Sequence, residues 1–365
     1  ADVLRPCGHA VQSRIYAEDP SKEFRPCAGL LSQVAFPSAG EASEAPLAGS
    51  KLRVDHWIES GLEVSPYYDP MLAKMIVYAD SREEALASLR HRLSETTIYG
   101  IETNLDYLQA LLASGPVKEG RYFTNTLAHF HFEKFALEVL TPGTMTTVQD
   151  FPGRCGYWDV GVPPSGPFDS RSFRLGNQLL DNPADAAGLE MTLSGPTLRF
   201  LSDTRIVLTG AHMSAEVDGT EVSFWTVLKI KAGQQLSIGK ISAGGSRAYL
   251  LIKGGIQCPT YLQSRSTFTL GQFGGHAGRA LRSGDVLHLK PCKPTDDLPV
   301  PVVPIALLPK ITNHWSLRVI PGPHAAPEFF TESYIQDFYK QDWKVHYNSS
   351  RTGVRLIGPK PEWAR

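Results

Sequence analysis

The chain has 365 residues and a formal net charge of −1, with 42% hydrophobic and 20% charged residues. This balance gives no reason to expect a nucleic-acid or membrane-surface partner, and no apolar stretch is long enough to span a membrane. The length suits two or three domains, each with its own core. Five scattered cysteines without CxxC spacing argue against a metal site and favour a reducing, cytoplasmic setting.

Residues 1–132 have the pattern of a mixed α+β unit. Alternating polar and apolar residues predict three strands, over 11–16, 51–60 and 75–78. A helix is predicted from Ser81, because Glu84 three residues later completes a capping box. The apolar face of this helix, at helical spacing, consists of Ala85, Leu86, Leu89 and Leu93.

From residue 136 the pattern changes to short strands separated by turns. These strands are predicted over 197–200, 205–208, 215–217, 222–225, 229–230, 235–238 and 248–252. Regular short strands with turns such as Asp218-Gly219 favour a closed β-barrel over residues 136–292. One helix interrupts the pattern at 170–180, with Phe173, Leu175 and Leu179 turned inward.

The last part of the chain is divided by a proline-rich stretch. Residues 293–312 hold Pro294, Pro299, Pro301, Pro304 and Pro309, which predict an extended linker. The run from Leu317 to His324 is predicted to start a second β unit within residues 313–365. Neither end of the chain carries a clear start or stop signal, so we interpret the chain as a piece of a longer protein.

Two polar loops, Thr146–Asp150 and Gly161–Asp169, stand between apolar segments. Consecutive prolines stiffen the second loop, and its glycines allow backbone conformations that other residues avoid. Such a loop holds side chains and backbone amides at fixed places. It is therefore the first candidate for a functional site.

The first 130 residues resemble the carboxy-terminal part of a biotin carboxylase domain. The resemblance rests on the stretches Gly8–Pro20, Pro66–Val77 and Gly100–Asn104. It implies that Arg53 faces biotin in a catalytic and cofactor-binding role, since a fixed guanidinium stabilises the enolate-like oxygen of deprotonated biotin. It also implies ATP and Mg²⁺, bound by an ATP-grasp half that these residues lack. The alternative is that Arg53 is a surface arginine in a strand.

Residues 136–365 resemble the carboxyltransferase related to allophanate hydrolase subunit 2. The matching motifs are Thr146–Asp150, Gly161–Asp169, Gly188–Thr192, Leu208–Ala211, Gly254–Ile256 and Ser264–Thr267. The resemblance implies mainly β, cyclophilin-like barrel subdomains, and hence an α+β class for the whole chain. It places the active site between two halves, so that the other half of the carboxyltransferase domain is a partner.

A carboxyltransferase must exclude water, hold its acceptor and stabilise carboxylate charge. Three carboxylates that can accept a hydrogen bond from an acceptor N–H are the predicted catalytic residues: Asp150, Asp169 and Glu190. The groups predicted to hold a carboxylate are Ser165, Gly166, Arg265, Ser266 and Thr267. His212 is a candidate for contact with biotin.

Each of these candidates has a simpler structural interpretation. Asp150 and Asp169 suit turn or helix caps, with Asp169 directly before the helix predicted at 170. Glu190 suits a satisfied structural carboxylate, and Arg265 suits a partner for an acid inside the barrel. A lone histidine such as His212 is more often structural. His276, which lies among glycines, is interpreted as a loop residue without a role.

The fusion of these two regions resembles the urea carboxylase family, the first component of urea amidolyase. It implies ATP- and bicarbonate-dependent carboxylation of urea to allophanate, with carboxybiotin carried by a biotin carrier domain outside this chain. A guanidine carboxylase of the same architecture stays open, because one oxygen or one protonated nitrogen distinguishes the acceptors. A non-catalytic or regulatory binding module also stays open, although the biotin carboxylase segment argues against it. A homodimer is expected by resemblance alone.

Overall fold

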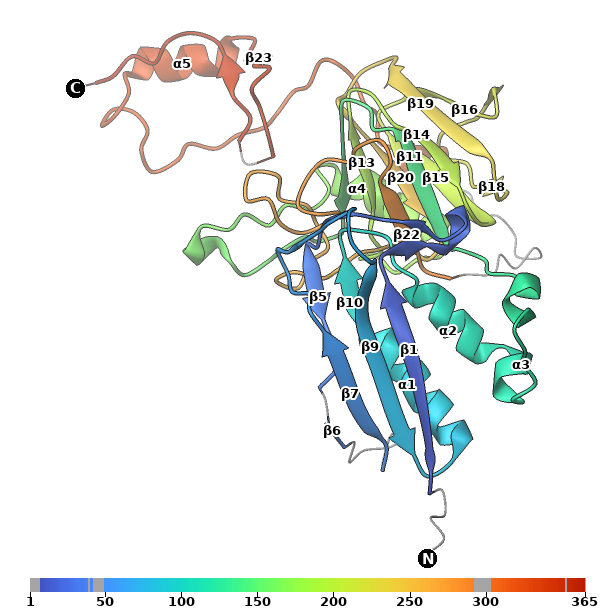
Figure 1. The fold of residues 1–365 in the computed structure, drawn as a ribbon. Coiled ribbons are helices and arrows are strands. Elements are labelled where there is room, and N and C mark those ends of the chain that lie inside the picture. The colour runs from blue at the N-terminus through green and yellow to red at the C-terminus, as the bar shows by residue number, and fades with distance from the viewer. Residues whose placement is uncertain (1–6, 39, 42–48, 292–302, 352, 365) are drawn as a thin grey trace, which may run out of the picture.

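The computed structural model describes residues 7–38, 40–41, 49–291, 303–351 and 353–364 (Figure 1). We refer to residues 7–132 as the amino-terminal part, to 136–291 as the β-sandwich part, and to 303–364 as the carboxy-terminal segment. Residues 293–302 of the predicted linker (293–312) lie outside the described residues. The remainder of the linker contains a short 3-10 helix, η4 (Ile305–Leu307).

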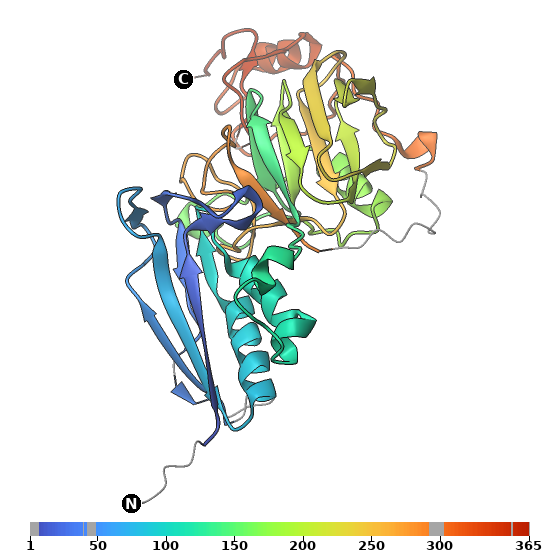
Figure 2. The same cartoon turned by 45° about the vertical axis from the view of Figure 1, so that its right-hand side comes forward.

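The amino-terminal part is a sheet covered on one face by helices (Figures 1 and 2). The antiparallel sheet has the order β1 (His9–Tyr16), β9 (Met71–Ala79), β7 (Lys51–His56) and β6 (Gly40–Glu41). The helices α1 (Arg82–Glu95), α2 (Leu105–Ala113) and α3 (Gly115–Lys118) follow. The predicted capping box of α1 is confirmed, with Ser81 Oγ accepting from Glu84 N at 3.2 Å and Glu84 Oε2 accepting from Ser81 N at 3.0 Å.

The predicted apolar face of α1 is buried against the sheet. Leu89 and Leu93 are fully buried and share one core with Met75 and Val77 of β9. Short elements complete this part: β2 (Glu18–Asp19), η1 (Pro20–Lys22), β3 (Arg25–Pro26), β4 (Gly29–Leu30), β5 (Gln33–Ala35), β8 (Glu63–Val64), β10 (Thr97–Tyr99) and η2 (Thr126–His129). Among them, β10 pairs with β5.

The β-sandwich part consists of two antiparallel sheets. One contains, in order, β17 (Thr220–Glu221), β16 (Met213–Val217), β19 (Gln235–Ile241), β14 (Thr197–Phe200), β11 (Ala136–Thr141), β22 (Val286–Leu289) and β21 (Ile256–Gln257). The other contains β12 (Met145–Gln149), β13 (Gly188–Thr192), β20 (Arg247–Ile252), β15 (Thr204–Gly210) and β18 (Leu228–Ile230). The 3-10 helix η3 (Trp158–Val160) lies in a connecting loop.

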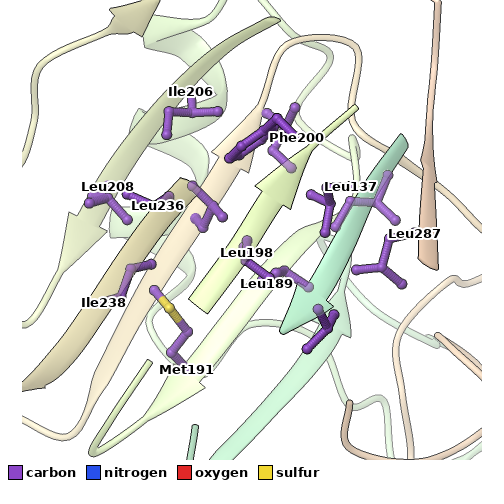
Figure 3. Close-up of a cluster of buried hydrophobic side chains, with 14 of the residues drawn as sticks. Leu137, Leu189, Met191, Leu198, Phe200, Ile206, Leu208, Leu236, Ile238 and Leu287 are labelled. Carbon is purple, nitrogen blue, oxygen red and sulfur yellow. The ribbon is translucent and has the colours of Figure 1, made fainter. Parts of the chain in front are cut away.

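The two sheets share one apolar core (Figure 3). Leu198 and Leu236 come from one sheet, Leu189 and Leu208 come from the other, and all four are fully buried. The strand β20 is buried on both faces, because helix α4 (Ser170–Leu179) covers the face turned away from this core. The helix predicted at 170–180 is thus confirmed.

The structure confirms the mixed α and β class but corrects three expectations about the strands. The predicted closed barrel is replaced by two open sheets, because no ladder joins their edges among the described strands. Residues 222–225 form no strand, since Val222 N donates to Ala215 O of one sheet and Trp225 N donates to Leu208 O of the other. The chain therefore crosses between the sheets at this point.

The third correction concerns the carboxy-terminal segment. The run 317–324 is not a strand, because no described segment pairs with its backbone. The segment instead contains helix α5 (Glu332–Lys340) and a two-stranded sheet of β23 (Lys344–Val345) and β24 (Leu356–Ile357).

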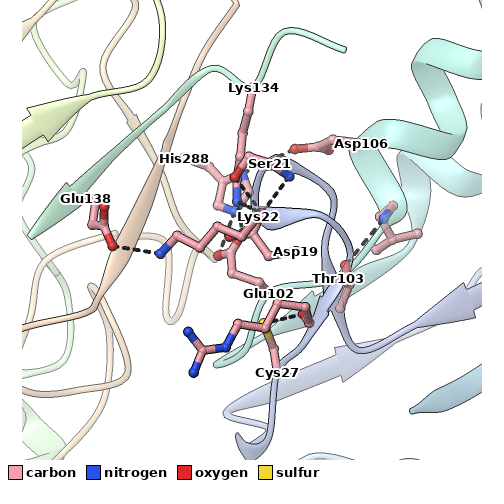
Figure 4. A network of polar contacts seen from close by, with 12 residues as sticks. Asp19, Ser21, Lys22, Cys27, Glu102, Thr103, Asp106, Lys134, Glu138 and His288 are labelled. Carbon is pink, nitrogen blue, oxygen red and sulfur yellow. Dashed lines mark hydrogen bonds and ion pairs between the residues drawn. The ribbon is translucent and has the colours of Figure 1, made fainter. Parts of the chain in front are cut away.

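Buried charges join the amino-terminal and β-sandwich parts (Figure 4). Lys134 Nζ lies 2.8 Å from Asp19 Oδ1 and 2.5 Å from Glu102 Oε2. His288 places its two ring nitrogens 3.1 Å from carboxylate oxygens of Glu102 and Asp106. Burial opposes the charged imidazolium, but these hydrogen bonds outweigh it and raise the pKa of His288 to about 10. The two parts are therefore fixed to each other by paired charges.

Candidate functional site

Of the two polar segments singled out in the sequence, residues 146–149 form part of strand β12 rather than a loop, because they pair with β13. The end of this segment at Asp150 and the loop 161–169 meet at one end of the β-sandwich part. Asp150, directly after β12, is buried and its carboxylate is fully engaged by the loop 264–266. It accepts hydrogen bonds from Ser264 Oγ at 2.6 Å, Arg265 N at 2.7 Å and Ser266 Oγ at 2.5 Å. Asp150 therefore fixes this loop, which is the structural interpretation considered from the sequence.

Arg154 clamps the same loop from the other side, although no sequence motif singled it out. It is only 1% exposed, and it donates to Tyr261 O at 3.1 Å and Ser266 O at 2.9 Å. Its guanidinium lies 4.8 Å from the centre of the Phe273 ring. Burial lowers the pKa of Arg154, and within the described residues it makes no ion pair.

The proline-containing loop packs against these residues. Arg154 N donates to Pro164 O, and a Cβ added to Gly153 would meet that same carbonyl oxygen at 2.5 Å. Only glycine allows so close an approach at the φ of +87° found here. Ser165 and Gly166 both have positive φ, and they lie beside Gly153. The structure thus brings Ser165 and Gly166 together with the Asp150 loop.

A second cluster surrounds Glu190, a residue of β13 that is only 1% exposed. Glu190 Oε2 accepts from Phe168 N at 2.7 Å and from Tyr249 OH at 3.1 Å. The same hydroxyl accepts a hydrogen bond from Asp169 N at 2.6 Å. Burial is the main reason why the pKa of Tyr249 is raised far above its ordinary value. Asp169 itself is the N-cap of α4, accepting from Ser172 N at 3.0 Å.

Two arginines flank the other oxygen of Glu190. Arg247 Nε lies 3.5 Å from Glu190 Oε1, and Arg351 Nη2 of the carboxy-terminal segment pairs with the same oxygen. The guanidinium of Arg247 also lies over the Phe168 ring, 5.3 Å from its centre. The Nε atoms of both arginines are buried without a hydrogen-bond partner among the described residues. One carboxylate therefore holds two cations, and the positive excess suits an anionic ligand.

The remaining predicted residues are held by the protein in other ways. Thr267 Oγ1 donates to Val148 O, and Arg265 Nε donates to Cys258 O at 3.2 Å. His212 is exposed, with Nδ1 2.8 Å from Ser242 Oγ. Arg53 lies in the other part of the molecule on β7, where its side chain is 71% exposed and makes a two-point pair with Asp55.

Several residues of these clusters were missed from the sequence. Tyr249 is hidden in an apolar strand pattern, and Arg247 and Arg351 stand in segments without an obvious motif. Only the spacing of Arg154, four residues after Asp150 in the same loop, was a usable signal. A cavity of about 930 Å³ at the junction of the two parts contains none of the predicted site residues. Most of the predicted site residues come together in the loop clusters instead, and these clusters are therefore the candidate site.

No group of three or more His, Cys, Asp or Glu side chains within the described part of the chain is placed to hold a metal ion. None of the described helices combines the length and apolar character needed to cross a membrane.

Two known families match this chain. Residues 160–365 match the family described as carboxyltransferase domain, subdomain A and B, and residues 12–129 match the biotin carboxylase C-terminal domain. The chain belongs to the carboxyltransferase domain family, as its sequence motifs predicted.

Comparison with individual proteins shows more specific similarities. The urea amidolyase of Saccharomyces cerevisiae is 45% identical over 363 residues, which are 98% of this chain and 19% of that protein. The crystal structure of Kluyveromyces lactis urea carboxylase matches with a TM-score of 0.86 and 45% identity, over 98% of this chain and 31% of that one. One of the 5-oxoprolinase subunits of Escherichia coli is 34% identical over 61% of this chain and 68% of that protein. The chain thus spans less than a third of the urea amidolyase and urea carboxylase it resembles.

Proposed function

We propose that this chain is part of a biotin-dependent carboxylase that carboxylates urea to allophanate with ATP and bicarbonate. The observation that carries the proposal is the fusion itself. A biotin carboxylase C-terminal domain runs directly into a carboxyltransferase domain, and the urea amidolyase relative keeps this arrangement over 98% of the chain. ATP and Mg²⁺ would bind in a biotin carboxylase region outside these residues.

The amino-terminal part offers a group that fits biotin. Asp55 holds Nε and Nη2 of Arg53, at 2.9 Å and 2.8 Å, while Nη1 makes no hydrogen bond to a described residue. The guanidinium is thus held in a fixed plane with free donors directed to solvent, as required to bind a ureido oxygen. Biotin on a carrier domain would supply the nitrogen that carries the carboxyl group between the two sites.

For the carboxyltransferase site, we propose that the three predicted carboxylates act by positioning other groups. Asp150 fixes the loop 264–266, Asp169 caps α4, and Glu190 holds Arg247 and Arg351. The arginines and the amides near Ser165 and Gly166 would then face the carboxylate being transferred. Contacts of Arg265, Ser266, Thr267 and His212 with ligands stay predictions.

We propose that other domains contact exposed apolar side chains in two regions of this chain. Ile320 and Tyr347 of the carboxy-terminal segment are 90% and 94% exposed, and Tyr67 of the amino-terminal part is 88% exposed. Large apolar side chains exposed to this degree support contacts with another part of the protein. We propose the other half of the carboxyltransferase domain and the biotin carrier domain as these partners, together with a homodimer and a cytoplasmic location. We also propose that the β-sandwich part is related to cyclophilin-like domains. The same proposal divides the chain into domains over 1–132, 136–292 and 313–365.

The test is acceptor-dependent ATP cleavage by the intact parent protein with bicarbonate and Mg²⁺, comparing urea, guanidine and no acceptor. Stimulation by urea is the expected result. Preference for guanidine would transfer the assignment to a guanidine carboxylase. Stimulation by neither, in a folded and biotinylated protein, would refute the proposed acceptor.

A further inference from the structure

A hydrogen bond between the two parts ends close to the candidate site. Tyr99 OH of β10 lies 2.7 Å from His276 Nδ1 of the β-sandwich part, with the two rings edge to face and 5.4 Å apart. The tyrosine backbone is itself fixed, because Ser32 N donates to Tyr99 O at 2.8 Å. Burial raises the pKa of the Tyr99 hydroxyl well above its ordinary value, so the hydroxyl stays protonated.

The other side of the imidazole is held by a carboxylate. His276 is 7% exposed, and its Nε2 lies 3.4 Å from Asp285 Oδ1. Asp285 is in turn bound by both terminal nitrogens of Arg279, at 2.7 Å and 2.8 Å. Burial alone would raise the pKa of Asp285, but the hydrogen bonds from Arg279 and His276 hold it well below its ordinary value. Tyr99 OH and Asp285 Oδ1 thus hold the two ring nitrogens of His276 from opposite sides.

The residues just before His276 are in direct contact with the candidate site. A Cβ on Gly274 would overlap Ser266 O and lie 2.6 Å from Arg154 Nη2, and a Cβ on Gly275 would overlap Thr267 Oγ1. Both glycines have positive φ, +71° and +55°. The turn that carries His276 therefore lies against the loop held by Asp150 and Arg154, without room for a side chain between them.

We propose that Tyr99 is a positioning residue for the carboxyltransferase site, acting through His276 on the turn at Gly274 and Gly275. The amino-terminal part would then be a structural component of the carboxyltransferase site, although the family to which it is similar performs the other half-reaction. This inference rests on the proposed function for its activity readout. The geometry of the turn can be tested independently of the acceptor.

The first experiment uses Tyr99→Phe in the intact parent protein, which removes only the hydroxyl. We expect the acceptor-dependent rate to fall roughly 10- to 100-fold through kcat, because a small misplacement of a site loop is costly. Acceptor-independent, bicarbonate-dependent ATP cleavage with free biotin is expected to stay within about twofold of the unsubstituted protein. The matched control is Tyr107→Phe, since Tyr107 is 7% exposed but its hydroxyl makes no hydrogen bond to a described residue.

The second experiment measures amide hydrogen exchange in the segment 264–278 of the same proteins. We expect faster exchange there in Tyr99→Phe and in His276→Ala, partial recovery in His276→Gln, and no change in Tyr107→Phe. Unchanged exchange in Tyr99→Phe, or equal losses in both half-reactions, would overturn the proposal. If the unsubstituted protein shows no acceptor-dependent rate, the proposed function fails, and the exchange measurement still decides the role of Tyr99.

Discussion

Lys134 Nζ lies 2.8 Å from Asp19 Oδ1, across 115 residues of sequence, and both side chains are almost completely buried. Glu102, which like Asp19 belongs to the amino-terminal part, is the second acid paired with Lys134. Desolvation is the largest influence on all three groups, yet the pairing outweighs it, because the pKa of Lys134 is raised and the pKa values of both acids are lowered. Two acids of the amino-terminal part thus hold a buried cation that lies two residues before β11, the first strand of the β-sandwich part.

Substitution of Lys134 by methionine should therefore be strongly destabilising. It leaves the buried Asp19 without its cation and leaves Glu102 with His288 alone, and breaking a buried pair typically costs about 3–5 kcal/mol of unfolding free energy. Chemical denaturation of the variant measures this value. Lys22→Met is the matched control, because Lys22 pairs with Glu138 across the same junction but is 40% exposed, so a loss of about 0–1 kcal/mol is expected. Equal losses in the two variants would contradict the buried network.

His288 should make stability depend on pH. Its pKa is about 10 in the folded protein and about 6.5 when unfolded, so folding takes up a proton between these values. The stabilisation is complete below pH 6.5 and is lost as the pH rises toward 10. The thermal midpoint should fall over this interval, and more steeply than in His288→Gln. Parallel curves for the two proteins would show that His288 is not held as an imidazolium.

Asp150→Asn should loosen the loop 264–266. The amide keeps the shape but replaces one acceptor oxygen by a donor, which leaves buried donors unpaired at a cost of about 1–3 kcal/mol. Denaturation of the variant against Asp159→Asn, a change at an exposed aspartate, measures the difference. An Asp150→Asn protein as stable as the control would show that the three hydrogen bonds do not fix the loop.

Glu190 and Arg351 should be energetically coupled, although 161 residues separate them in sequence. A double-mutant cycle with Glu190→Gln and Arg351→Gln should give a coupling of about 1–3 kcal/mol in stability, because their pair is largely buried. In the intact parent protein, each single variant should also lose acceptor-dependent activity. Additive effects on stability would mean that the carboxy-terminal segment is not anchored at Glu190.

Arg53→Ala should separate the two half-reactions. If Arg53 binds the ureido oxygen, its loss should lower biotin carboxylation by about 100-fold or more, as for other preorganised donors to a developing oxyanion. Carboxyl transfer from already carboxylated biotin to the acceptor should continue. Asp55→Asn should show a smaller loss, because Asp55 only orients the guanidinium. Survival of both half-reactions in Arg53→Ala would remove Arg53 from the proposed site.

The sequence by itself determined the local elements and the family. Helix α1 follows from its capping box and leucine spacing, and α4 from Asp169 and the apolar positions after it, since both signals act within a few turns of chain. The motif between residues 161 and 169 predicted a loop, because its prolines restrict the backbone and its glycines allow positive φ.

Only the tertiary structure decided how these pieces are joined. Whether the strands after residue 136 close into a barrel depends on which edges pair, and edge pairing is not encoded in the alternation of any one strand. Arg351 reaches Glu190, and His276 reaches Tyr99, through contacts between residues 161 and 177 positions apart. Such pairs form when separate elements pack together, so their partners could not be identified from a single sequence.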